Sequence, residues 1–154
     1  MLTTLIASAA AALASAGSLV LALPVWAMFI GLIAFYTRVL DTRSAIENLA
    51  CTGIGLATGV VASVALAHVG LSTGIMIALP AVVFAVAILV VSLRGLPMLN
   101  NVPAYFLGLV AWFAGHLEPS LESVAELFGA NAIGVIAGWV SFKVPAWLSA
   151  RAKA

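Results

Sequence analysis

WAMFIGLIAFY, at residues 26–36, occurs a second time in altered form as PAYFLGLVAWF, at residues 103–113. Ala, Phe, Gly, Leu and Ala coincide in the two copies, and most other pairs exchange one apolar side chain for another. Further along, Gly55 aligns with Gly134 and Gly59 with Gly138. The spacing is 77 residues (26 to 103) and then 79 residues (55 to 134) in a chain of 154. The sequence therefore predicts two similar halves.

The composition indicates a membrane protein. Hydrophobic residues make up 65% of the chain and charged residues only 7%, and the mean hydropathy is +1.27. Soluble domains carry about 25% charged residues. A net charge of +1 and a single cysteine, Cys51, give no reason to expect nucleic-acid binding, a metal or another cofactor. We expect one membrane domain over residues 1–154, with half-repeats at about 1–70 and 71–154.

Six apolar segments predict an all-α membrane protein, because they are too long and too continuously apolar for the strands of a barrel. Their expected boundaries are about 2–22, 24–38, 46–67, 72–93, 102–117 and 123–143. The second and fifth segments are short, with about 14 apolar residues or about 21 Å of helix each. Short segments at matching places in two halves often mark the central site of a transporter. The alternative is that each helix simply continues for one more turn.

The basic residues predict the orientation in the membrane. With both termini in the cytoplasm, all six basic residues lie inside, and the outer side holds Glu118 and Glu122. The six are Arg38, Arg43, Arg94, Lys143, Arg151 and Lys153. This is the positive-inside pattern. It requires an even number of spans, so each half has three, and the sequence predicts an inverted 3+3 repeat.

Two pairs of glycines lie at equivalent places in the third and sixth segments. Gly55 and Gly59 form one pair, and Gly134 and Gly138 form the other. Glycines four residues apart lie on one face of a helix and allow another backbone to approach closely. We expect these two helices to cross each other near the axis that relates the halves; the alternative is an interface between subunits.

The short segments supply the candidates for a pore. Phe29 and Phe106 each precede a glycine, Gly31 or Gly108, by two residues. One ring from each half could close a hydrophobic constriction, although lipid-facing or core aromatic residues give the same pattern. Polar contacts are expected from Thr52 and Asn131, which align in the repeat. An amide inside the hydrocarbon needs a partner, which is either a neighbouring helix or a solute.

Acidic residues form a candidate vestibule on the outer side. Glu118, Glu122 and Glu126 recur every four residues, which is typical of a solvated helix face. Attraction of cations at an outer mouth is the functional interpretation. The structural alternative is that carboxylates favour helix N-termini. It applies equally to Glu47, which aligns with Glu126 and has Arg43 four residues before it.

The two glycine motifs resemble those of a small bacterial family known as domain of unknown function 1097. The similarity lies in Trp26-Ala27-x-Phe29-x-Gly31-x-x-Ala34, in Val102-Pro103-x-x-Phe106-x-Gly108-x-x-Ala111-x-Phe113-Ala114-Gly115, and in the Gly134-x-x-x-Gly138 helix that ends near Lys143. The resemblance implies a multi-pass protein of the bacterial inner membrane. It implies no substrate and no functional residues.

Two functions follow from these features. The first is a passive channel or simple transporter for a small neutral or weakly polar solute, with its path between the halves. The alternative is a membrane scaffold or accessory subunit whose glycine faces bind partner helices. No catalytic motif is present, so we do not expect an enzyme. Membrane lipid and a second copy of the chain are the expected partners. A wet cavity on the axis favours transport, and a dry, packed axis favours the scaffold.

Overall fold

The structure is a computed structural model that describes residues 1–151. This part of the chain is all-α and contains no strand. Its six α-helices are α1 (Leu2–Val20), α2 (Val25–Phe35), α3 (Thr42–Thr73), α4 (Ile75–Ser92), α5 (Val102–Gly115) and α6 (Leu121–Arg151). A short 3₁₀ turn, η1 (Leu93–Gly95), follows α4. The predicted segments are thus all helical. Lys153, one of the six basic residues, lies outside the described residues.

Four of these helices are long and apolar enough to cross a membrane: α1, α3, the α4–η1 unit and α6. The other two, α2 with 11 residues and α5 with 14, reach only about 17 and 21 Å at 1.5 Å per residue. A hydrocarbon core of about 30 Å is longer than either. The short helices therefore do not extend beyond their apolar stretches, and most of their surroundings are protein.

Local signals explain where the short helices begin and end. Pro24 stands at the N-cap of α2, and Pro103 lies in the first turn of α5, where the absence of an N–H costs no hydrogen bond. The side chain of Asn101 caps α5 by accepting from the Ala104 N–H. At the other end, His116 adopts a left-handed conformation with φ 48°, which terminates the helix.

The long helices α3 and α6 extend further than the sequence predicted. Helix α3 starts at Thr42 because Asp41 caps it, accepting from the Ser44 N–H at 2.6 Å. It ends at Gly74, whose φ of 78° suits glycine. Helix α6 continues through Pro145 to Arg151. Both helices thus continue past their apolar segments into polar residues. Hydropathy alone does not predict where such helices end, because the final turns are polar.

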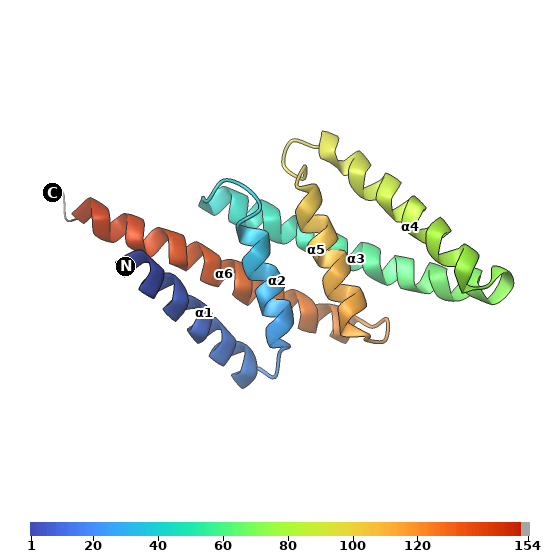
Figure 1. The fold of residues 1–154 in the computed structure, drawn as a ribbon, viewed down its shortest axis with the longest axis horizontal. Helices are drawn as coiled ribbons and strands as arrows, with labels where there is room; N and C mark the ends of the chain where they lie inside the picture. Colours follow the sequence, from blue (N-terminus) through green and yellow to red (C-terminus); the bar gives the residue numbers. More distant parts are fainter. Residues whose placement is uncertain (152–154) are drawn as a thin grey trace.

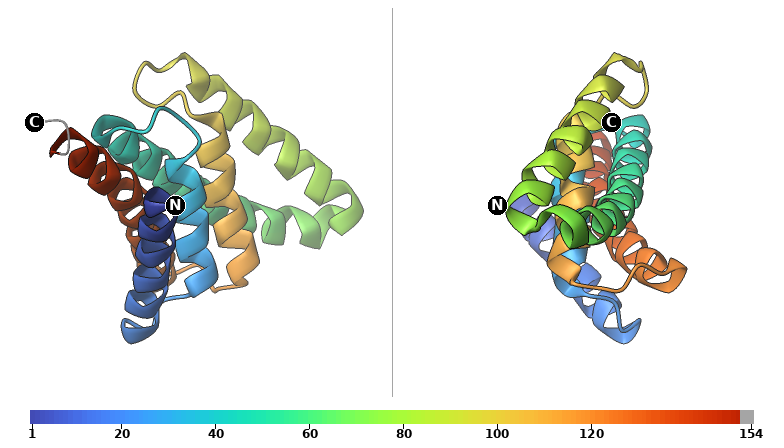
Figure 2. Two further views of the ribbon diagram at one scale, coloured as in Figure 1. Left: turned by 60° about the vertical axis from the view of Figure 1, so that its left-hand side comes forward. Right: turned by 90° about the vertical axis from the view of Figure 1, so that its right-hand side faces the viewer.

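Helices α3 and α6 form the long backbone of the molecule, and the other four helices lie on one side of them (Figures 1 and 2). Helices α1 and α4 stand at opposite ends, α1 against α6 and α4 against α3. The short helices lie side by side between them, and each packs mainly on one long helix: α2 on α6, and α5 on α3. Each short helix therefore packs mainly on the long helix of the other half.

Candidate functional site

The same contacts recur where each short helix crosses a long one. A Cβ on Gly31 would overlap the backbone of Asn131, and one on Gly134 would overlap the backbone of α2 at Met28 and Leu32. At the second crossing, Gly108 lies against the backbone of Thr52, and Gly55 against that of Tyr105. Both crossings are therefore backbone against backbone and leave no room for a solute.

The glycine pairs do not cross each other, which corrects the expectation from the sequence. Gly59 faces Trp112 of α5, where an added Cβ would lie 2.7 Å from the Trp112 Cβ. Gly138 faces Phe35 of α2, where the closest approach would also be 2.7 Å. Each long helix presents its glycines to a short helix, because the backbones of these two helices approach closely there.

The aromatic constriction expected from Phe29 and Phe106 is not formed. The side chains are 43% and 42% exposed, whereas Gly31 and Gly108 are buried. Residues two positions apart lie about 200° apart around a helix, so burying the glycine turns the ring outward. Phe106 lines a crevice among α3, α4 and α5 together with Phe113.

Thr52 and Asn131 are fully buried and lie at the two crossings. The Thr52 hydroxyl donates to the carbonyl of Asn48 at 2.9 Å, and the Asn131 amide donates to the carbonyl of Leu127 at 2.7 Å. The Asn131 Oδ1 atom has no hydrogen-bond partner in the described part of the chain. An unpaired buried acceptor is costly and rare.

The three glutamates of the candidate vestibule have no common partner in the described chain. Glu118 and Glu122 are exposed and Glu126 is half-buried, and none of them forms an ion pair within residues 1–151. Glu47, the repeat counterpart of Glu126, is in a different state. Its side chain is only 8% exposed and binds both Arg38 and Arg43 at 2.8 Å. The two halves therefore differ at these equivalent positions.

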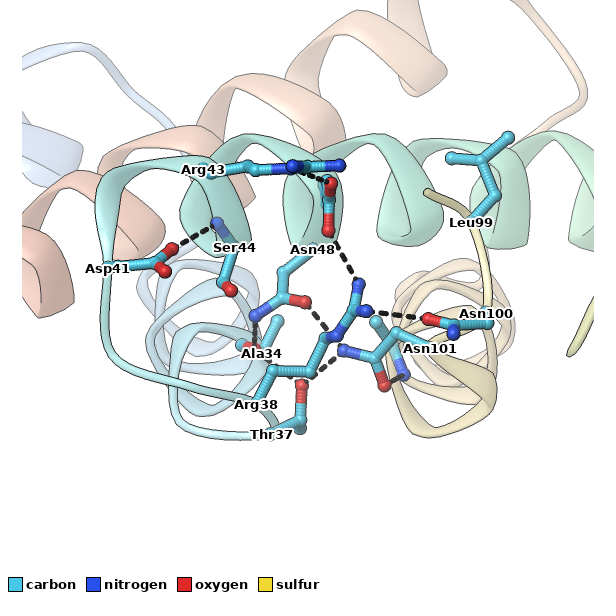
Figure 3. Close-up of polar contacts among 12 residues, drawn as sticks. Ala34, Thr37, Arg38, Asp41, Arg43, Ser44, Asn48, Leu99, Asn100 and Asn101 are labelled. Carbon is cyan, nitrogen blue, oxygen red and sulfur yellow. Dashed lines mark hydrogen bonds and ion pairs between the residues drawn. The ribbon is translucent and has the colours of Figure 1, made fainter. Parts of the chain in front are cut away.

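The most developed polar site lies where α3 begins, α2 ends and α5 begins (Figure 3). We call it the junction cluster and define it by Thr37, Arg38, Glu47, Asn48, Asn100 and Asn101. The first half supplies the first four of these residues, and the second half supplies the two asparagines before α5. The cluster thus joins the two halves.

Arg38 is the charged link across the junction cluster. One guanidinium nitrogen donates to Glu47 at 2.8 Å and the other to the Asn100 side chain at 2.6 Å. The Arg38 side chain is 24% exposed, so this link lies where the cluster meets the surface. Charge-assisted bonds of this kind are stronger than neutral ones.

Two buried amides form the inner layer of the cluster. The Asn101 amide donates to Asn48 Oδ1 and to the Thr37 hydroxyl, both at 2.6 Å. Asn48 in turn donates to the carbonyl of Ala34 at 2.9 Å, at the end of α2. Buried amides in an apolar protein are stable only when paired in this way.

Sequence reasoning missed Asn48. For Asn100–Asn101 it predicted either a cap of the fifth helix or a place at the mouth of a path, and Asn101 is the N-cap of α5. Asn48 and Asn101 are 53 positions apart in the chain, and their repeat counterparts, Leu127 and Pro24, are apolar. The only available signal was a pair of amides beside apolar runs, at Asn48 and at Asn100–Asn101.

Comparison with known proteins agrees with the resemblance that the glycine motifs indicated. The family described as a protein of unknown function, DUF1097, matches residues 2–146. No curated protein and no solved structure matches the chain. The match covers nearly the whole chain, and with several membrane-length apolar helices it indicates a membrane protein. The chain belongs to the DUF1097 family.

Proposed function

We propose that this protein is a passive channel or simple transporter for a small neutral or weakly polar solute. The observation that carries the proposal is the junction cluster, where both halves supply amide and guanidinium groups to one buried site. Helix packing alone does not require two buried amides and an ion pair at this place. Ionisable and polar groups at membrane depth most often serve a function.

The proposal includes an inverted 3+3 repeat in a bacterial inner membrane, with both termini in the cytoplasm. The repeat is supported by the two crossings, in which Gly31 and Asn131 correspond to Gly108 and Thr52. The orientation is supported by the basic residues of the described chain, which lie on the side of the junction cluster, while Glu118 and Glu122 lie in the loop and first turn on the opposite side. The short helices then complete the passage through the membrane between the long ones.

The path is closed in this arrangement. The four glycine contacts seal the crossings, and the junction cluster seals the cytoplasmic end of the boundary between halves. Opening requires the halves to separate at the cluster: the Arg38 link breaks, and hydrogen bonds to a solute replace those between Asn48 and Asn101. The unpaired Asn131 oxygen supplies a polar contact in the outer half.

The second candidate is the scaffold or accessory subunit, and the dry glycine crossings favour it. One observation argues against a scaffold that binds partner helices through its glycine faces. Gly55, Gly59, Gly134 and Gly138 already contact α5 and α2 of the same chain, so these faces are not free to bind partner helices. A scaffold has to use its outer helices, α1 and α4, instead.

Stopped-flow flux into proteoliposomes separates these two functions. The panel is water, urea, glycerol, ammonia, small weak acids and monovalent ions, with empty vesicles as the control. Transport predicts flux of one or a few neutral solutes above the control. If folded protein passes no member of the panel, the scaffold becomes the better proposal.

A further inference from the structure

A crevice on the outside of the molecule lies between the first half of α3 and the second half of α6. It has a volume of about 180 Å³. Its walls are formed by Thr42, Ala45, Ile46 and Leu49 of α3 and by Val135, Ile136 and Trp139 of α6. The two polar groups among them, the Thr42 hydroxyl and the Trp139 indole N–H, bond each other, so the remaining apolar walls suit a hydrocarbon chain and not a polar solute.

Two basic residues lie one helical turn beyond the apolar walls. Arg43 precedes Ile46 by three residues and Lys143 follows Trp139 by four, so each is on the crevice face of its helix. Both are exposed. Arg43 binds Glu47 only through Nε within the described chain, and its side chain is 73% exposed. The other guanidinium nitrogens are directed to solvent and can bind an anion.

The hydrogen bond from the Trp139 indole to the Thr42 hydroxyl places these two cations near each other, because Arg43 follows Thr42 directly and Lys143 lies one helical turn beyond Trp139. The Ser44 N–H lowers the pKa of Asp41 most, and the positive charges of Lys143 and Arg43 lower it further. Lys143 of α6 is therefore close to the start of α3. Three cations, Arg38, Arg43 and Lys143, face two carboxylates, Asp41 and Glu47, so this end of the crevice retains a net positive charge.

Trp139 marks the level at which polar and apolar surroundings meet. Its indole N–H donates to the Thr42 hydroxyl at 2.9 Å, while its ring lines the crevice. Tryptophan is enriched at membrane–water interfaces, where one edge is hydrated and the ring is in hydrocarbon. The order along the helices is thus cations, an interfacial tryptophan, then an apolar crevice.

The larger crevice between α3 and α4 lacks this combination. The crevice between α3 and α4, lined by Ala57, Val61 and Val82 among others, has no pair of cations at its ends. At the opposite end of the α3–α6 pair, the repeat counterpart of Leu49 is Phe128, whose ring packs on Gly53. A larger side chain therefore occupies the place that is open beside Leu49.

We propose that this crevice is a binding site for an anionic phospholipid of the surrounding bilayer. One acyl chain lies between α3 and α6, and the headgroup phosphate lies between Arg43 and Lys143. The proposal does not depend on transport, because it concerns a surface outside the boundary between the halves. With three cations against two carboxylates, the net charge of about +1 at this end of the crevice gives roughly a fivefold preference for anionic over zwitterionic lipid.

Quenching of Trp139 fluorescence by brominated acyl chains tests the proposal. The protein is reconstituted in dioleoylphosphatidylcholine with a fixed minor fraction of brominated phosphatidylglycerol or brominated phosphatidylcholine. The Trp139 contribution is the difference between the wild-type protein and Trp139→Phe. We expect the phosphatidylglycerol to quench this contribution at several-fold lower mole fraction than the phosphatidylcholine.

Matched variants separate charge from shape. Arg43→Gln with Lys143→Gln should remove the preference, whereas Arg94→Gln with Arg151→Gln, an equal loss of charge away from the crevice, should retain it. Leu49→Phe should reduce quenching by both lipids because it fills the crevice. Equal quenching by the two lipids in wild-type protein, or loss of the preference in both double variants, would overturn the proposal. Displacement by inorganic phosphate would also overturn it, by assigning the site to free phosphate.

Discussion

At the scale of single residues, the two halves of this protein differ most at positions where only one half takes part in a polar network. Asn48 and Glu47 stand in a bonded, buried site, whereas their repeat counterparts, Leu127 and Glu126, have no such partners. A repeated sequence produces equivalent backbones and leaves individual side chains free to diverge. The junction cluster is therefore not a product of the repeat itself.

Asn101→Ala tests whether the inner layer of the cluster stabilises the fold. The change leaves the acceptors on Asn48 and Thr37 and the Ala104 N–H without their partner. Unsatisfied buried groups cost about 1–3 kcal/mol each, and we expect a loss of about 3 kcal/mol in the free energy of unfolding. Titration with sodium dodecyl sulfate in mixed micelles, followed by circular dichroism, measures it.

The comparison variant is Asn100→Ala, whose side chain is exposed and bonds only Arg38 in the described structure. We expect it to cost less than about 1 kcal/mol, because water replaces the lost bond. Equal losses for the two variants would show that the buried amides have no special importance.

At the scale of helices, the order and approximate bounds were predictable because long apolar runs have few other solutions in a membrane. The helices that pack on the glycine faces could not be predicted. Gly55-x-x-x-Gly59 indicates close approach but does not identify which helix approaches, and the partner proved to be α5. The orientation of Phe29 could have been derived from its spacing to Gly31. Residues two positions apart lie on nearly opposite sides of a helix, so if one is buried the other faces outward.

Gly31→Ala tests the packing of a short helix on a long one. The new Cβ would overlap the Asn131 backbone, and since backbone cannot move aside as a side chain can, we expect a loss of about 3 kcal/mol. Gly17→Ala is the control, because nothing lies within 4 Å of the added atom. It should be neutral or slightly stabilising, since alanine favours the helix. Equal effects would contradict the close crossing of α2 and α6.

At the scale of the whole molecule, the arrangement links the two halves through their short helices. Helix α2 packs on α6 and α5 on α3, so neither half is a separate unit and any opening has to move both. The chain is a membrane protein of the DUF1097 family.

Labelling of single cysteines tests the topology. In a Cys51→Ala background, Ser120→Cys should react with a membrane-impermeant maleimide in intact cells, because it lies in the proposed outer loop before α6. Met98→Cys, in the proposed cytoplasmic loop before α5, should react only after the cells are opened. Reaction of both in intact cells, or of Met98→Cys alone, would contradict the proposed orientation of the halves.

The most direct test of the account is the effect of Arg38 on solute flux. Arg38→Gln breaks the charged link from Glu47 to Asn100. Hydrogen bonds to charged groups contribute about 1.5–3 kcal/mol, so flux of the accepted solute should rise roughly tenfold. Arg94→Gln removes an equal charge from the same side of the protein, outside the cluster, and should leave the flux unchanged. If Arg38→Gln conducts no faster than the wild-type protein and Arg94→Gln, the junction cluster does not close a path between the halves.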